Sequence, residues 1–266
     1  MTKYLVSLLP GSGIGSAIVG ILGALYFLHK NHIQTVLFVN VFHAPKPVKT
    51  LIQHFLDISK ISIVQFIHIR YGYNPDYHPS HEYKELSFVK EIDDIYHVLQ
   101  NPDTDFSLFV QWFHAIFILK PSCQLELYKL KYYDICINIR RGDKITLESH
   151  LSCASVAQYI DEIEKIHLPH VSICHTSDEY NTFLEIQAIR PDWKISTLNT
   201  PEEKGYFLNE LTVNTDDHNF DHVYKFIKQL HIMKNSTFFI GTLSTNVGFM
   251  VQLLRQQRRD EKNVYI

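Results

Sequence analysis

Ile135-Cys136-Ile137-Asn138-Ile139-Arg140-Arg141-Gly142-Asp143-Lys144 is the segment that is most informative about the architecture of this chain. Its first five residues are mostly apolar and β-branched, as in a parallel strand that is buried on both faces. The run then stops at two adjacent arginines, and a lysine follows shortly after them. In open α/β sheets, the loops at the carboxyl ends of the strands hold the ligand. Because a guanidinium group matches phosphate oxygens two at a time, the stretch predicts a site for a ligand that carries a pyrophosphate.

The length and composition are those of an ordinary folded protein. The chain has 266 residues, of which 45% are hydrophobic and 20% are charged, which allows one large domain or two lobes of about 130 residues each. The formal net charge of -3 does not indicate the excess of positive charge that is typical of proteins that bind a nucleic acid or an anionic membrane. The 16 histidines are scattered and lack the spacing of a zinc site. We therefore expect neither a nucleic-acid partner nor a metal.

An uncharged stretch at residues 4–28 raises the alternative of a signal peptide or a membrane span. A glycine-rich turn, Pro10 to Ser16, divides it into a strand over 4–9 and a helix over 14–30. The next strand, at 35–39, follows at βαβ spacing, which favours a cytoplasmic protein without a transmembrane segment. The backbone N–H groups of the turn suit a phosphate, and Gly13 is a candidate contact. The glycine spacing is not that of a dinucleotide-binding fingerprint.

The middle of the first half is less regular. We expect a helix at 44–59, a strand at 61–69, and helices at 88–99 and 106–119. The polar stretch 70–85 is predicted to be a loop, which either contacts an acceptor or is a solvated connection. Trp112, Phe113 and Phe117 are interpreted as core residues. Cys136 and Cys174 lie in apolar runs and are interpreted as small buried hydrophobic residues rather than as a disulfide.

From about residue 126, strands and helices alternate afresh. We expect strands at 135–139, 171–175, 193–198 and 237–240, and helices at 155–166, 180–189, 220–233 and 247–258. Two successive sets of βαβ units predict an α/β protein with two Rossmann-like lobes and a cleft between them. The N-terminal lobe would cover residues 1–125 and the C-terminal lobe residues 126–266.

Polar loops follow three strands of the second half. They are Arg140 to Lys144, Thr176 to Glu179, and Gly241 to Asn246. In the last loop, Ser244, Thr245 and Asn246 precede a helix, a position that suits an anion or serves ordinary helix capping. Three loops that converge on one sheet edge, two of them with phosphate-binding residue types, favour the anion.

These loops resemble the motifs of a known family. Ile137 to Lys144 is similar to the first motif of the superfamily of α1,6-fucosyltransferases, nodulation-factor fucosyltransferases and protein O-fucosyltransferases, which typically reads His-x-Arg-Arg-(Gly/Thr)-Asp. His175 to Asp178 is similar to the second motif, a strand that runs into Thr-Asp or Asp-Asp. Phe239 to Gly248 is similar to the third, which carries Ser-Ser-x or Ser-x-Asn before a helix. Asn138 replaces the histidine of the first motif, and Ser177 replaces one aspartate of the second.

The resemblance implies a GT-B glycosyltransferase that transfers L-fucose from GDP-fucose to a glycan hydroxyl, with inversion and without a metal. By motif position, Arg140 would hold the β-phosphate, and Arg141 would support the loop or a phosphate. Asn138 occupies a position that contacts the guanine in the family. The other substrate-binding candidates are Lys144, Asp178, Ser244, Thr245 and Asn246. The C-terminal lobe would bind the nucleotide sugar and the N-terminal lobe the acceptor.

Inversion requires a base that takes the proton of the acceptor hydroxyl. In the α1,6 branch of the family, a glutamate lies eight residues after the first motif arginine, and that position is Glu148 here. Its alternative role is that of an exposed carboxylate at the start of a helix. Asp143 is the second candidate for the base, and its alternative role is to brace the arginines.

Three other interpretations stay open. The same fold would serve an enzyme that uses another nucleotide sugar, or a nucleotide- or glycan-binding protein without turnover. A membrane-anchored interaction protein is suggested by the apolar N-terminus alone. The presence of Arg140, Lys144 and Glu148 together favours catalysis, because binding alone would not require Glu148.

Overall fold

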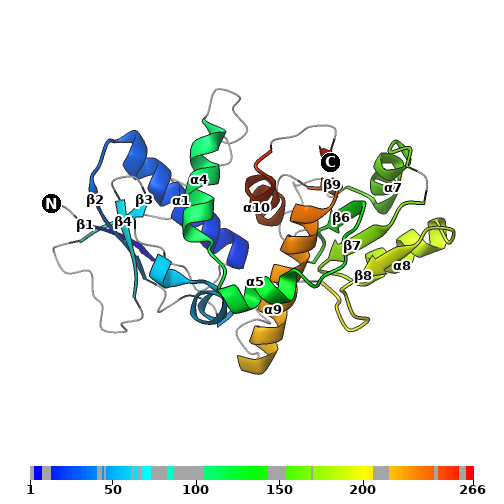
Figure 1. Ribbon diagram of the computed structural model, residues 1–266, viewed down its shortest axis with the longest axis horizontal. Helices are drawn as coiled ribbons and strands as arrows, with labels where there is room; N and C mark the ends of the chain where they lie inside the picture. The colour runs from blue at the N-terminus through cyan, green and yellow to red at the C-terminus, as the bar shows by residue number, and fades with distance from the viewer. Residues whose placement is uncertain are drawn as a thin grey trace. The chain divides into compact units, whose positions relative to one another are not determined.

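The structure of the chain is a computed structural model, drawn in Figure 1. It describes residues 3–7, 13–40, 44, 46–60, 63–64, 67–72, 83–86, 105–142, 154–168, 170–205, 216–242, 245–257 and 262–266. The chain divides into two compact units, residues 1–124 with 211–223 and residues 125–210 with 224–266. Each unit contains a five-stranded sheet of its own.

The first unit is built on a sheet in the order β3-β4-β2-β1-β5. Its strands are β1 (Lys3–Ser7), β2 (Thr35–Asn40), β3 (Ile63–Val64), β4 (Ile67–Gly72) and β5 (Tyr83–Glu85). Its helical elements are α1 (Ile14–Lys30), α2 (Lys46–Thr50), a π-helical turn at Leu51–Phe55, a 3-10 turn at Ile58–Lys60, and α4 (Phe106–Ile116). The pairings β1–β2, β1–β5 and β2–β4 are parallel, and β3 pairs with β4 antiparallel.

Helix α1 accounts for the uncharged N-terminal stretch. It begins at Ile14 and ends at Lys30, as predicted, and most of its residues are buried. A helix that is apolar on all sides belongs in a core, and α1 packs against α4, where Tyr26 stacks on Phe109 with ring centroids 5.5 Å apart. Trp112 and Phe113 of α4 are buried, as expected. No helix in the described part of the chain is long and apolar enough to cross a membrane.

Several predictions for the first unit are wrong at element ends. The helix expected at 44–59 is only α2 followed by the two short turns. Of the loop expected at 70–85, residues 70–72 belong to β4 and residues 83–85 to β5, and residues 73–82 lie outside the described residues. Pairing with β2 and β1 extends these strands into a polar sequence that has no strand pattern of its own. The helix predicted at 88–99 lies outside the described residues.

The second unit is built on a parallel sheet in the order β10-β9-β6-β7-β8. Its strands are β6 (Ile135–Ile139), β7 (Ile173–Ser177), β8 (Ile195–Thr197), β9 (Phe238–Gly241) and β10 (Asn263–Tyr265). Its helices are α7 (Val156–Glu164), α8 (Asn181–Ile189) and α10 (Asn246–Arg255). The helices α5 (Pro121–Leu127) and α9 (Asp216–Asn235) contribute residues to both units. β10 was not predicted, because its three residues are too few to show the periodicity of apolar residues that indicates a strand.

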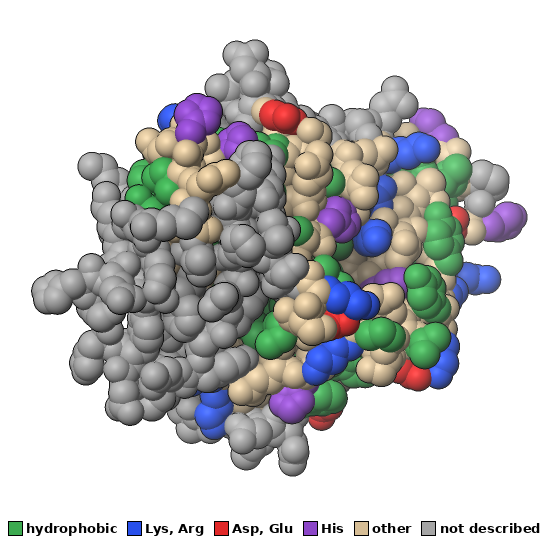
Figure 2. Space-filling model, turned by 60° about the vertical axis from the view of Figure 1, so that its left-hand side comes forward, with side chains coloured by type: hydrophobic (Ala, Val, Ile, Leu, Met, Phe, Trp, Pro, Cys, Tyr) green, Lys and Arg blue, Asp and Glu red, His purple; other side chains and the backbone are tan. Residues whose placement is uncertain are grey.

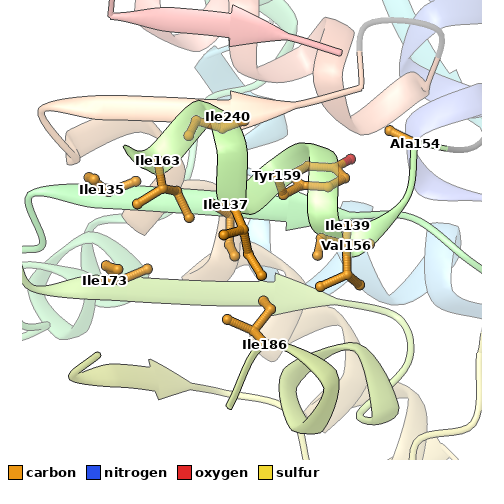
Figure 3. Close-up of a cluster of buried hydrophobic side chains, with 11 residues drawn as sticks. Ile135, Ile137, Ile139, Ala154, Val156, Tyr159, Ile163, Ile173, Ile186 and Ile240 are labelled. Atoms are coloured by element: carbon orange, nitrogen blue, oxygen red, sulfur yellow. The ribbon is translucent and has the colours of Figure 1, made fainter. Parts of the chain in front are cut away.

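Alternate residues of β6 form the core of this unit. Ile135, Ile137 and Ile139 are fully buried and face α7, which supplies Tyr159 and Ile163 to the same cluster (Figure 3). Helix α7 begins at a capping box, in which Ser155 and Gln158 satisfy each other's backbone N–H groups. The other face of β6 includes Cys136, which is buried and unoxidised, and its register partner Cys174 is buried and free as well.

The chain order of the second sheet creates a switch point beside β6. From β6 the chain proceeds to β7 and β8 on one side, and then to β9 and β10 on the other. The carboxyl ends of β6 and β9 therefore flank the switch point, which is where open α/β sheets bind their ligands. In the view of Figure 2, the basic and acidic side chains of the described residues are interspersed rather than gathered by sign.

Candidate functional site

Arg140 and Asp178 meet at the carboxyl ends of β6 and β7. The two strands pair with Ile139 opposite Ser177, so the residues that follow leave the sheet side by side. Arg140 Nη1 forms an ion pair with Asp178 Oδ2, and the Arg141 N–H donates to Asp178 Oδ1 at 2.8 Å. The Arg140 and Asp178 side chains are 16% and 13% exposed. One carboxylate therefore holds both the guanidinium group and the backbone of the turn after β6.

Arg141 and Gly142 shape this turn. The Arg141 guanidinium donates from Nη1 to the Arg140 carbonyl oxygen at 3.2 Å, and its side chain is half-buried. Gly142 has a φ of 61°, in the left-handed region that residues with a Cβ rarely adopt. The turn thus requires a glycine directly after the two arginines, which gives a physical reason for their order in the sequence.

The chain passes from β9 into α10 through a tightly packed corner. Thr245 caps the helix, because its Oγ1 accepts from the Gly248 N–H at 3.0 Å and donates to the Thr242 carbonyl at 2.8 Å. A Cβ at Gly248 would lie 2.1 Å from that carbonyl oxygen, so the corner requires glycine there. The Thr242 hydroxyl is hydrogen-bonded to Tyr159 Oη at 2.8 Å. The Thr245 hydroxyl is therefore engaged in capping, the alternative role noted for this loop.

The N-terminus of α10 has the electrostatic character of an anion site. It is the positive end of the helix dipole, and the first turn of α10 contains no acidic residue. β9 neighbours β6 in the sheet, with Ile240 opposite Ile137, so this helix end and Arg140 follow the two strands that flank the switch point. Backbone N–H groups and cations at the same sheet edge suit a phosphate-bearing ligand.

Asn138 lies just inside the end of β6, with a side chain that is largely buried. Its Nδ2 donates to Thr176 Oγ1 at 3.1 Å, and that hydroxyl donates to the Ile137 carbonyl at 2.8 Å. The amide group thus links β6 to β7 on one face of the sheet. Its expected contact with the base of a nucleotide stays a prediction.

His175, the first residue of the second motif, has a structural role. It is fully buried, with Nε2 2.8 Å from Thr182 Oγ1 and Nδ1 3.2 Å from Thr197 Oγ1. Because the Thr182 hydroxyl donates to the Glu179 carbonyl at 2.8 Å, we assign the ring proton to Nε2. Burial lowers the pKa of His175 to about 3, and the charge of Lys225 acts in the same direction. The neutral ring fastens β7 to β8 and α8.

Acidification should destabilise the protein through His175. The native pKa of about 3 lies below the value of about 6.5 in an unfolded chain. The unfolded state therefore binds the proton first, and the stabilisation that is present above pH 6.5 is lost as the pH falls towards 3. Between pH 7 and 5 this residue should lower the free energy of unfolding by about 2 kcal/mol, measured by urea denaturation. A His175→Gln variant should show a pH dependence smaller by that amount, and an unchanged dependence would contradict the assignment.

Gly13 belongs to the first unit, where it precedes α1. Its backbone is extended, with a φ of -69° and a ψ of 171°, and its carbonyl accepts from the Ala17 N–H at 3.0 Å. It follows β1, which lies between β2 and β5, so the first sheet also has its switch point at β1. The phosphate contact expected of Gly13 stays a prediction, and Gly11 of the same turn lies outside the described residues.

Four of the predicted site residues lie outside the part of the chain that the structure describes. They are Asp143, Lys144, Glu148 and Ser244. Among the described residues, no group of three or more His, Cys, Asp or Glu side chains is placed to hold a metal ion. The described site thus consists of Arg140, Arg141 and Asp178 on one side of the switch point, and Thr242, Thr245 and Asn246 on the other.

Two residues that support this site were not anticipated from the sequence. Tyr159 holds Thr242 from helix α7, and Asn199 binds the backbone of Ser177 at the end of β7. A tyrosine at an apolar position of an amphipathic helix predicts a core residue, and an asparagine after a strand predicts a turn residue. A single sequence therefore does not indicate that Tyr159 or Asn199 supports the site.

These features define an α/β protein with a cation-bearing edge at the carboxyl ends of a parallel sheet. In sequence, no family model and no curated protein matches the chain. In structure, the chain is similar to the NodZ α-1,6-fucosyltransferase soaked with GDP-fucose, with a TM-score of 0.58, 8% identity, and coverage of 96% of this chain and 93% of that one. The fucosyltransferase NodZ from Bradyrhizobium gives a TM-score of 0.57, 9% identity, and coverage of 96% and 94%.

A second group of solved structures shares the fold. POFUT1 in complex with GDP-fucose is similar with a TM-score of 0.56 and 10% identity, over 100% of this chain and 99% of that one. The resemblance to these fucosyltransferases that the motifs predicted is therefore confirmed at the level of the fold. At 8–10% identity, the likeness is one of architecture, and activity has to be argued from the site.

Proposed function

We propose that the chain is a metal-independent, inverting glycosyltransferase of the GT-B type, which transfers L-fucose from GDP-fucose to a glycan hydroxyl. The observation that carries the proposal is the Asp178 carboxylate, which holds Arg140 and the Arg141 backbone at the carboxyl end of β6, beside the switch point of the sheet. The structures of NodZ and POFUT1 that share the fold were obtained with GDP-fucose. The proposal includes the cytoplasmic location expected from the sequence.

The chemistry of the leaving group explains why arginines are needed. Breaking the bond to fucose leaves a nucleoside diphosphate, and fixed cations neutralise its developing charge without a metal. Each direct charge-assisted contact contributes about 2–4 kcal/mol at the transition state. A guanidinium group has five N–H donors, and Arg140 forms its ion pair with Asp178 through Nη1. Asp178 thus orients Arg140 before the diphosphate arrives, which reduces the cost of reorganisation during the reaction.

The roles proposed for the other residues follow from their motif positions in the sequence. Arg141 would support the turn or a phosphate, and Lys144 would add a cation. Thr245 and Asn246 bring the N-terminus of α10 to the diphosphate, together with Ser244. Asp143 or Glu148 takes the proton of the acceptor hydroxyl. In this proposal, residues 126–266 form the nucleotide-sugar lobe and residues 1–125, with Gly13, the acceptor-side lobe.

One observation favours a second candidate, an enzyme of the same fold with another nucleotide sugar. Asn138 replaces the histidine of the first motif, and its amide nitrogen is directed to Thr176 in the sheet. The base contact expected at this position therefore differs in chemistry from that of an imidazole. The first experiment should therefore determine which nucleotide the protein binds.

Thermal unfolding with GDP, UDP and ADP tests the proposal. A ligand at about 100 times its dissociation constant adds about 2.7 kcal/mol to the free energy of unfolding, which corresponds to a rise of about 5 °C in Tm. GDP should produce this rise, and UDP and ADP should produce less at the same concentration. Equal shifts with the three nucleotides would remove the preference for GDP, and the absence of any shift would contradict nucleotide binding.

A further inference from the structure

Besides its pairing with β6, the end of β7 is held by a buried asparagine. Asn199 follows β8 and is only 6% exposed. Its Oδ1 accepts from the Ser177 N–H at 3.1 Å, and its Nδ2 donates to the Ser177 carbonyl at 2.7 Å. The amide therefore binds both backbone groups of the last residue of β7, much as a neighbouring strand would. The next residue in the chain is Asp178, which holds Arg140.

The segment that begins at Asn199 also holds Asp178 itself and Tyr180. The Gly205 N–H donates to the Asp178 carbonyl at 3.0 Å, and the Tyr180 N–H donates to the Glu203 carbonyl at 2.9 Å. Glu179 and Lys204 form an isolated antiparallel bridge between the two contacts. The turn that carries the Asp178 carboxylate is thus clamped by backbone hydrogen bonds to residues 203–205, which leaves its position dependent on that segment.

Charged side chains hold Asn199 in turn. Asn199 Nδ2 also donates to Glu203 Oε2, and Glu203 Oε1 forms an ion pair with Lys225 of α9. The Glu203 and Lys225 side chains are 30% and 24% exposed, so solvent screens the pair only in part. Burial lowers the pKa of Lys225 to about 8, whereas the ion pair with Glu203 favours the charged form. A continuous chain of contacts therefore leads from α9 through Glu203 and Asn199 to Ser177.

We propose that Asn199, oriented by Glu203 and Lys225, is a positioning residue that sets Asp178 and, through it, the phosphate-binding guanidinium of Arg140. The inference rests on the proposed function for the role of Arg140, and it adds a residue that touches no substrate. Loss of the amide removes the clamp on Ser177 and leaves two buried backbone groups without this partner. The Asp178 turn then samples more conformations, and Arg140 is less well oriented for a diphosphate.

The test compares two buried asparagines of the same sheet. Asn199→Ala should weaken GDP binding by about fivefold to tenfold in titration calorimetry, through the coupling of the two sites. The matched control is Asn263→Ala, because Asn263 is also buried and hydrogen-bonded, to Arg255 and Gln257, but begins β10 at the opposite edge of the sheet. The control should stay within about twofold of wild type even if its Tm falls equally. Should Asn199→Ala not fold, Asn199→Asp keeps an acceptor for the Ser177 N–H but places a carboxylate beside Glu203.

A double mutant shows whether the effect passes through Arg140. In an Arg140→Lys background, which loses the guanidinium fork, Asn199→Ala should change the GDP affinity by less than about twofold. An equal loss of affinity in both backgrounds, or no loss in wild type, would overturn the positioning role. NMR of the Arg140 Nη–H groups detects the ion pair with Asp178, which is made by Nη1, without any ligand. Their protection from solvent exchange should fall in Asn199→Ala and not in Asn263→Ala, so the inference is tested even if GDP binding itself, and with it the proposed function, fails.

Discussion

Replacing Arg140 with alanine is expected to weaken GDP binding by about 30-fold to 1,000-fold, because the diphosphate loses a charge-assisted contact of about 2–4 kcal/mol. Transfer from GDP-fucose should fall at least as much. The structure adds a second consequence, because Asp178, with a side chain only 13% exposed, would lose its cation. The free energy of unfolding should therefore fall by about 1–3 kcal/mol. Calorimetry with GDP measures the first effect and urea denaturation the second.

Arg190→Ala is the matched control for Arg140→Ala. Arg190 also lies in the second unit and forms ion pairs with Glu164 and Asp192, but it follows α8, away from the carboxyl ends of β6 and β9. Exposed ion pairs contribute little to stability, so this variant should fold. Because Arg190 lies away from the proposed phosphate site, the variant should bind GDP like wild type. If Arg140→Ala folds and keeps the wild-type affinity, the ion pair with Asp178 is the whole role of Arg140, and the phosphate site is excluded.

Glu148→Gln should separate binding from catalysis. A general base contributes about 100-fold to 10,000-fold to the rate, so transfer of fucose should fall by that factor, whereas the dissociation constant for GDP should not change. The amide keeps the size of the carboxylate and removes its basicity. The measurement is single-turnover transfer with saturating GDP-fucose, alongside calorimetry with GDP.

Asp143→Asn decides between the two candidate bases. If Asp143→Asn stops transfer and Glu148→Gln keeps the full rate, the base is Asp143. If Asp143 braces the arginines instead, its variant should weaken GDP binding together with transfer. A loss of GDP affinity in Glu148→Gln would assign this residue to the donor rather than to the acceptor.

Local sequence pattern was sufficient for the elements that define the site. The apolar run Ile135–Ile139 predicted a buried strand, and β6 has these bounds and is buried throughout. The amphipathic pattern of residues 155–166 predicted a helix there, and α7 covers Val156–Glu164. The end of β4 and the short strands β5 and β10 were missed, because pairing with distant strands, rather than local composition, makes these residues extended.

The order of residue types was enough to show that cations follow a buried strand, and that strands and helices alternate so that the loops after β6, β7 and β9 share one sheet edge. Which side chains meet at that edge depends on the folded chain. Asp178 reaches Arg140 across 38 positions of sequence because β6 and β7 pair in one register, and Tyr159 reaches Thr242 across 83 positions because α7 packs over β6 and β9. Such contacts depend on strand order and register, which a single sequence encodes only through the packing of the whole chain.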